Sequence, residues 1–151
     1  MIGKILINNA LVIGCHALFC IISGVFIAVT ASIGISIESP QLHTIFVVGY
    51  SIIFLLLYYL CGRFVLRNTY DVGANLLSVG ALVFIIFAGV LFTKISPSFG
   101  MVNMPFYPIL VEVYYSETPE SLHMIVQLLV APLPSLAMWI GMITTKLTAS
   151  G

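Results

Sequence analysis

The chain has 151 residues, of which 61% are hydrophobic and only 7% are charged, and its mean hydropathy is +1.19. Five basic and five acidic residues give a net charge of zero. A soluble domain, in which roughly a quarter of the residues are charged, needs more polar surface than this composition supplies. The sequence therefore predicts an integral membrane protein. It has no basic cluster, so we expect no nucleic-acid partner.

Four segments are apolar and long enough to cross a bilayer, which takes about 20 helical residues. They run over residues 5–35, 43–66, 72–92 and 122–145. The first is too long for the hydrophobic part of a signal peptide, so we interpret it as a retained helix. The predicted fold is an all-α bundle of four transmembrane helices that forms one integral-membrane domain over residues 1–151.

The connections between these segments differ in character. Ser39 and Pro40 precede the second segment as an N-cap and a first helical residue. Residues 94–121 are rich in aromatic residues and proline, a composition typical of the membrane interface. We expect them to form a structured loop that lies on the membrane surface or dips into it.

A short charged turn separates the second and third segments. Arg63, Arg67 and Asp71 follow one another at intervals of four residues. Lys4 and Lys146 fall on the same predicted side, so the positive-inside rule places both termini in the cytoplasm of a plasma (inner) membrane and the 94–121 loop outside. The three charges of the turn are interpreted as membrane anchors and a helix cap, or alternatively as a contact site for a partner or anionic lipid.

Small residues indicate where transmembrane helices approach one another. The first segment carries Gly24, Ala28 and Ser32 at every fourth position, and the third and fourth segments also contain small residues, whereas the second is bulky. We therefore expect close contacts among the first, third and fourth helices, with the second facing lipid or a partner. Pro132 and Pro134 predict a break in the fourth helix, either a purely structural bend or part of a gate or ligand site.

Few side chains suggest chemistry. His43 and His123, near the outer ends of two segments, are weak candidates for a metal site with nearby glutamates. His16, inside the first segment, is expected to hydrogen-bond another helix. Cys15, Cys20 and Cys61 are interpreted as packing residues. No catalytic or cofactor-binding motif is present in the sequence, so we expect neither an enzyme nor a cofactor.

The sequence supports three functions, in order of preference. The first is a non-catalytic subunit of a membrane assembly of the transport or export type, in contact with the lipid bilayer and with other membrane chains as a homo- or hetero-oligomer. The second is a carrier, channel or immunity-type protein that acts through its own bundle. The third is an intramembrane enzyme acting on lipid or peptide.

Overall fold

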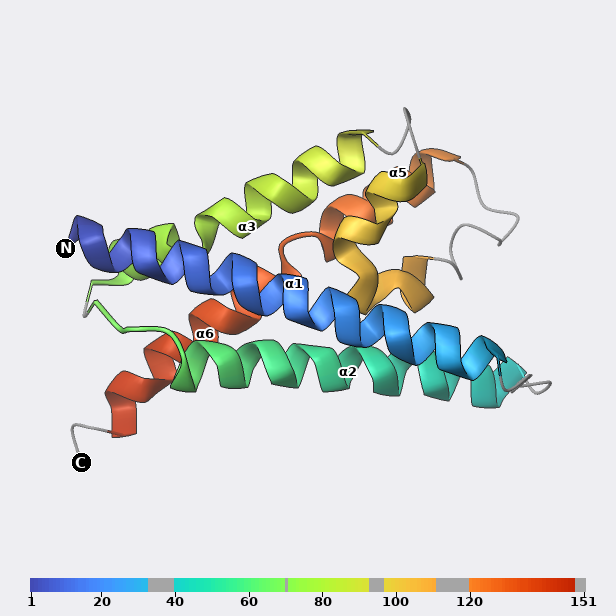
Figure 1. The fold of residues 1–151 in the computed structure, drawn as a ribbon, viewed down its shortest axis with the longest axis horizontal. Coiled ribbons are helices and arrows are strands. Elements are labelled where there is room, and N and C mark those ends of the chain that lie inside the picture. Colours follow the sequence, from blue (N-terminus) through green and yellow to red (C-terminus); the bar gives the residue numbers. More distant parts are fainter. Residues whose placement is uncertain (33–39, 70, 93–96, 111–119, 149–151) are drawn as a thin grey trace.

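The computed structural model describes residues 1–32, 40–69, 71–92, 97–110 and 120–148. These residues form α1 (Ile2–Ser32), α2 (Pro40–Phe64), α3 (Val72–Phe92), η1 (Pro97–Phe106), α5 (Glu120–Val130) and α6 (Leu133–Thr148) (Figure 1). Four stretches are long and apolar enough to cross a membrane: Ile2–Ser32, Gln41–Phe64, Val72–Phe92 and Ile125–Thr144. The prediction of an all-α protein with four helical segments that could span a membrane is confirmed.

The helix bounds follow local chemistry. α3 has the predicted bounds, and α2 begins at Pro40, a residue whose fixed φ angle suits the first position of a helix. α1 begins at Ile2 rather than at residue 5. Its predicted end at residue 35 lies outside the described residues.

The fourth predicted segment is two helices rather than one. α5 ends at Val130, Ala131 and Pro132 form a turn, and α6 begins at Leu133. Pro132 and Pro134 have no N–H, so the carbonyls of Leu128 and Val130 lose the donors that a continuous helix would give them. The chain changes direction at this point (Figure 1).

The helices pack in two main pairs, α1 with α3 and α2 with α6, and α3 also contacts α6. The closest approach joins α2 to α6. A Cβ atom added at Gly62 would lie 2.0 Å from the Met138 carbonyl oxygen, and one added at Gly141 would lie 2.1 Å from the Tyr59 carbonyl oxygen. Only glycine permits such contact between backbones.

This pairing corrects the expectation that the second helix would make the fewest close contacts. α2 is bulky over most of its length, but Gly62 near its end meets the Met138 backbone of α6, and Gly141 of α6 meets the Tyr59 backbone of α2. Conversely, Ala28 and Ser32 of α1 are exposed. Counting small residues identified α1 as a packing helix, yet its small residues lie mostly on the face turned away from the bundle.

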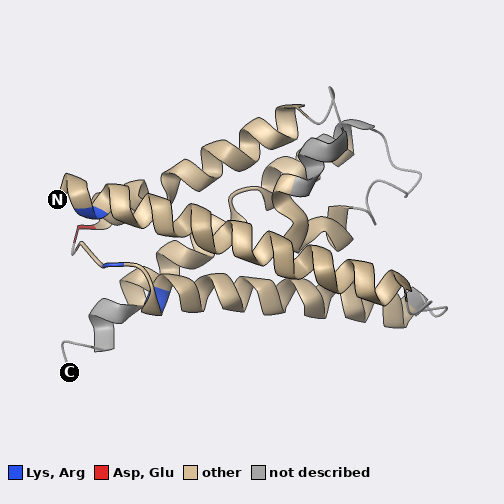
Figure 2. Cartoon of the chain, viewed as in Figure 1, with Lys and Arg blue, Asp and Glu red and all other residues tan. Residues whose placement is uncertain are grey.

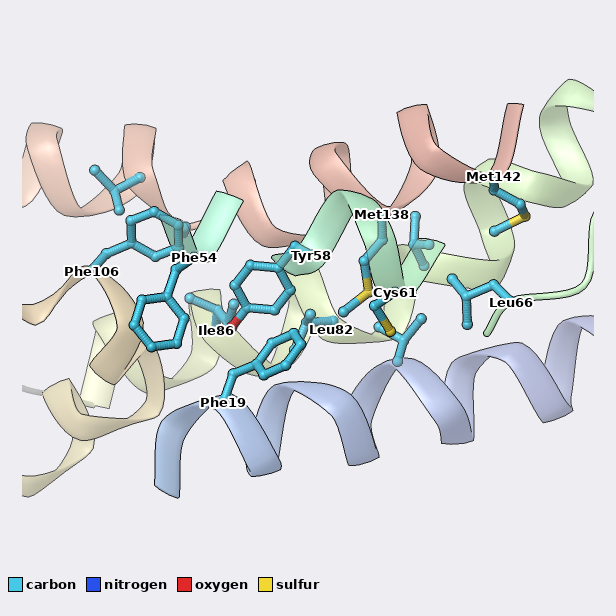
Figure 3. Close-up of a cluster of buried hydrophobic side chains, with 14 of the residues drawn as sticks. Phe19, Phe54, Tyr58, Cys61, Leu66, Leu82, Ile86, Phe106, Met138 and Met142 are labelled. Carbon is cyan, nitrogen blue, oxygen red and sulfur yellow. The ribbon is translucent and has the colours of Figure 1, made fainter. Parts of the chain in front are cut away.

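Large side chains fill the centre of the bundle (Figure 3). Tyr58 of α2 is fully buried, with its ring centroid 4.8 Å from that of Phe19 in α1 and 6.3 Å from that of Phe106 in η1. Phe106 is itself fully buried. The η1 segment therefore reaches into the core and is part of the bundle's packing.

The outer surface suits a hydrocarbon environment. Many large apolar side chains are exposed, among them Ile21, Ile52 and Phe84. The charged residues coloured in Figure 2 lie at one end of the bundle, the end that also carries the N-terminus. This separation of charge from apolar surface is what a bilayer requires.

Candidate functional site

One polar cluster of the bundle interior lies where α1 meets η1. Nε2 of His16 is 2.6 Å from the Val102 carbonyl oxygen, and the Ser23 hydroxyl donates to the Met104 carbonyl oxygen at 2.9 Å. The backbone of Asn103, between these carbonyls, is non-helical (φ −118°, ψ 39°). Irregular backbone within a membrane protein needs polar partners from the protein, and here α1 provides them at about the middle of its length.

The contacts of His16 define its tautomer. A carbonyl oxygen can only accept, so Nε2 carries the hydrogen that is donated to Val102. Nδ1 then accepts from the Tyr58 hydroxyl, with the two atoms 2.7 Å apart. A neutral imidazole satisfies both bonds in this nearly fully buried position. The expected hydrogen bond from His16 to another helix is confirmed, with Tyr58 of α2 as the partner.

Cys20 is close to His16 but is not arranged as a nucleophile beside a base. Its sulfur lies 3.5 Å from Nε2 of His16 and 3.7 Å from the Val102 carbonyl oxygen. Because Nε2–H is donated to Val102, this nitrogen has no lone pair with which to accept the thiol proton. The arrangement positions η1 and does not resemble a catalytic dyad.

A second set of contacts lies farther along α1. The hydroxyls of Ser23 and Tyr50 are hydrogen-bonded to each other. Since Ser23 donates to Met104, Tyr50 is the donor to Ser23. Asn103 is buried, and among the described residues neither polar atom of its side chain has a hydrogen-bond partner. This cluster thus contains both satisfied and unsatisfied polar groups.

Cys15 of α1 and Cys61 of α2 lie against each other between the two helices. Their sulfur atoms are 2.8 Å apart, and all three cysteines are free thiols. Cys61 belongs to the central hydrophobic cluster, and Cys15 packs against it. Their surroundings are those of packing residues.

Asparagines connect the charged end of the bundle. The side chain of Asn8 donates to the Arg67 carbonyl at 2.8 Å and accepts from the Arg67 N–H at 3.0 Å. Asn9 bridges the Leu77 carbonyl and the Ala81 N–H of α3, at 2.9 and 3.1 Å. These amides attach α1 to the α2–α3 turn and to α3.

Two further asparagines complete this network. Asn68 donates to the Met142 carbonyl of α6 at 2.9 Å and accepts from Asn75 at 2.9 Å. Asn75 also accepts from the Thr69 N–H and hydroxyl. The α2–α3 turn is therefore bonded to α1, α3 and α6.

The charged residues of the turn have separate roles. Asp71 accepts from the Ala74 N–H at 2.7 Å and so caps the N-terminus of α3. The Arg63 guanidinium donates to the Tyr59 hydroxyl at 3.0 Å and lies 5.7 Å from the ring centroid of Phe64. Arg67 is exposed and is held through its backbone by Asn8. A docking role for Arg63, Arg67 and Asp71 stays a prediction.

His43 lies in the first turns of α2, and His123 in those of α5. Among the described residues, no group of three or more His, Cys, Asp or Glu side chains converges as a metal site would require. Of the glutamates expected beside them, Glu38 and Glu112 lie outside the described residues, as does the side chain of Glu120. The metal site proposed for the two histidines stays a prediction.

Sequence reasoning found His16 but missed its partners. Tyr58 and Tyr50 lie within a bulky apolar run. The one available signal is their hydroxyl groups, because a tyrosine buried among apolar residues usually has a hydrogen-bond partner. Asn103 lies in the predicted loop, where a polar side chain is expected and therefore does not indicate a buried position.

These features define the class: a small helical membrane protein with four candidate spans and a buried polar cluster at its centre. No family model, curated protein or solved structure matches the chain.

Proposed function

We propose that this protein is a non-catalytic subunit of a membrane assembly and that it binds another membrane chain through the outer face of α1. The observation that supports this proposal is the composition of that face. Its exposed positions recur at steps of three, four and seven residues. They are Gly3, Ile7, Ala10, Gly14, Ala17, Ile21 and Ala28.

This face lies opposite the buried face of α1, which contains Asn8, Val12, His16, Phe19 and Ser23. Added Cβ atoms at Gly3 and Gly14 would meet nothing within 4 Å. Lipid-facing helix surfaces need no small residues, whereas helix–helix interfaces are enriched in them because they allow backbones to approach. A stripe of small residues on the free side of α1 therefore favours a helix of another chain as its neighbour.

The test is purification in mild detergent of the wild type and of a Gly14→Leu, Ala17→Leu double variant. Both positions are exposed, so the monomer should tolerate leucine. We expect the wild type to elute with a second chain, either another copy of itself or a different protein, and the double variant to elute alone. Gly49→Leu on α2, where an added Cβ meets nothing within 4 Å, is the matched control. A wild type that elutes as a monomer contradicts the proposal.

A second candidate is a carrier or channel that acts through its own bundle. It is favoured by η1, whose non-helical backbone at Asn103 lies beside His16, Cys20 and Ser23 in the bundle centre. Transport proteins use such interrupted segments to present carbonyls to a substrate. In this chain the carbonyls of Val102 and Met104 already accept from α1, so the subunit function is preferred.

The plasma (inner) membrane, with both termini in the cytoplasm, remains the proposed location. Its basis is the basic residues at one end of the bundle. Labelling Gly3→Cys and Ser116→Cys from outside the cell, in a cysteine-free background, tests it: only Ser116→Cys should react.

A further inference from the structure

A groove with a volume of about 240 Å³ lies between α3 and the first turn of α6. Leu77, Gly80, Val83 and Phe84 line it on the α3 side, and Pro132 and Ser135 line the opposite side. Its walls are almost entirely apolar. It is separate from the polar cluster around His16.

The groove opens towards the hydrocarbon region. Leu77 and Phe84 at its rim are 65% and 77% exposed, and Phe84 belongs to the middle part of α3 (Val72–Phe92). Since the ends of a spanning helix lie at the two membrane surfaces, this part of α3 lies at the depth of the lipid chains. A molecule that enters the groove must therefore arrive from the bilayer.

Two backbone features produce the hollow. Gly80 has no side chain, and an added Cβ there would meet nothing within 4 Å. On the opposite side, the turn at Ala131 and Pro132 interrupts the helix, so no continuous helical surface covers this part of α3. The groove therefore results from the proline break together with a glycine.

The groove also contains an unsatisfied polar group. Ser135 is 2% exposed, and its Oγ has no hydrogen-bond partner among the described residues. Trp139 follows one turn later on the same side of α6, and its buried Nε1 also has none. An unsatisfied donor is costly in a hydrocarbon environment. Of these two groups only Ser135 lines the groove. An oxygen that only accepts would complement its hydroxyl.

We propose that the α3–α6 groove binds a lipid-soluble molecule that has an apolar body and a hydrogen-bond-accepting oxygen, such as a ketone or ester carbonyl. The apolar body fills the space beside Gly80 and Val83, and the oxygen accepts from the Ser135 hydroxyl. This site does not depend on the outer face of α1, so it is independent of the proposed subunit function.

The test uses benzophenone, an apolar diaryl ketone that inserts into nearby C–H bonds under ultraviolet light. The full chain, reconstituted in phospholipid nanodiscs, is labelled over a range of benzophenone concentrations, and the modified residues are located by mass spectrometry. We expect saturable labelling within residues 76–84 and 132–136.

Three variants and one control decide the outcome. Gly80→Leu and Val83→Phe fill the groove and should reduce labelling there at least tenfold. Ser135→Ala removes the donor and should reduce it about threefold or more. Gly49→Leu on α2, which has open space for the added side chain, should leave labelling unchanged. The single tryptophan, Trp139, reports through its fluorescence whether each variant is folded.

Non-saturable labelling, or labelling that persists in both filled variants, overturns the site. Labelling that is lost on filling but unchanged in Ser135→Ala overturns the ligand class, since the groove then accepts any hydrocarbon chain. Ser135→Ala is a conservative change at a group without a partner and should fold, so this comparison remains decisive even if a filled variant does not.

Discussion

Replacing Gly62 by alanine should disrupt the contact between α2 and α6. The added Cβ would lie 2.0 Å from the Met138 carbonyl oxygen and 2.7 Å from the Met138 Cα. A carbon and a carbonyl oxygen normally stay about 3.3 Å apart, so the backbones must separate by more than about 1 Å. Overpacking against side chains costs about 1–3 kcal/mol. Backbone atoms cannot rotate away, so we expect a loss of about 3 kcal/mol or more.

Gly49→Ala provides the control in the same helix. An added Cβ at Gly49 meets nothing within 4 Å, and alanine favours helix over glycine by up to about 1 kcal/mol. The control should therefore be neutral or slightly more stable than the wild type. The free energy of unfolding is measured by titrating folded protein in mild detergent with a denaturing detergent, with Trp139 fluorescence and circular dichroism as readouts. Equal stability of Gly62→Ala and Gly49→Ala would refute the close approach of the two helices.

The remaining predictions concern the polar contacts and the charged turn. Asn8→Ala leaves the Arg67 N–H and carbonyl without partners and should lower the free energy of unfolding by about 2 kcal/mol. Thr30→Ala removes only bonds within α1 and should change this free energy by less than about 0.5 kcal/mol. Equal effects of the two changes would contradict the role of Asn8. Tyr58→Phe removes the donor to His16 and should lower the free energy of unfolding by about 1 kcal/mol. His16→Ala also removes the hydrogen bond to the Val102 carbonyl, and it should make a cysteine introduced at position 102 more accessible to labelling. Unchanged labelling would mean that His16 does not hold η1. Arg63→Glu with Arg67→Glu should give mixed membrane orientation in the Gly3→Cys labelling assay, and a single unchanged orientation would show that these arginines do not set it.

The helices were predictable because their signals are local. A span is read from a run of apolar residues, and the starts of α2 and α3 follow from Pro40 and Asp71, which act on their own first turns. The same is true of the proline turn between α5 and α6. None of these features depends on which helices are neighbours.

The packing could not be predicted because it depends on facing surfaces. Gly62 and Gly141 matter only because α2 and α6 are paired, and nothing near either glycine in the sequence shows this. The small residues of α1 were visible, but sequence alone does not show which side of a helix faces the bundle when apolar residues surround it.

The polar cluster around His16 was predictable only in part. His16 was identifiable because a histidine within a span needs a partner. Its acceptor is a backbone carbonyl of η1, and any residue at position 102 offers such a group. The contact of η1 with α1 therefore could not be predicted from the side chains of residues 97–110, in which Asn103 is the buried polar residue.

The proposed role of α1 is tested most directly by photo-crosslinking in intact membranes. A photoreactive amino acid is placed at Ala17, on the outer face of α1, and in a separate variant at Ile52, an exposed position of α2 that is 58% exposed. We expect irradiation to give a discrete crosslinked protein product from Ala17 and only lipid adducts from Ile52. Lipid adducts alone from both positions would contradict the account, because they would show that the small-residue face of α1 borders lipid.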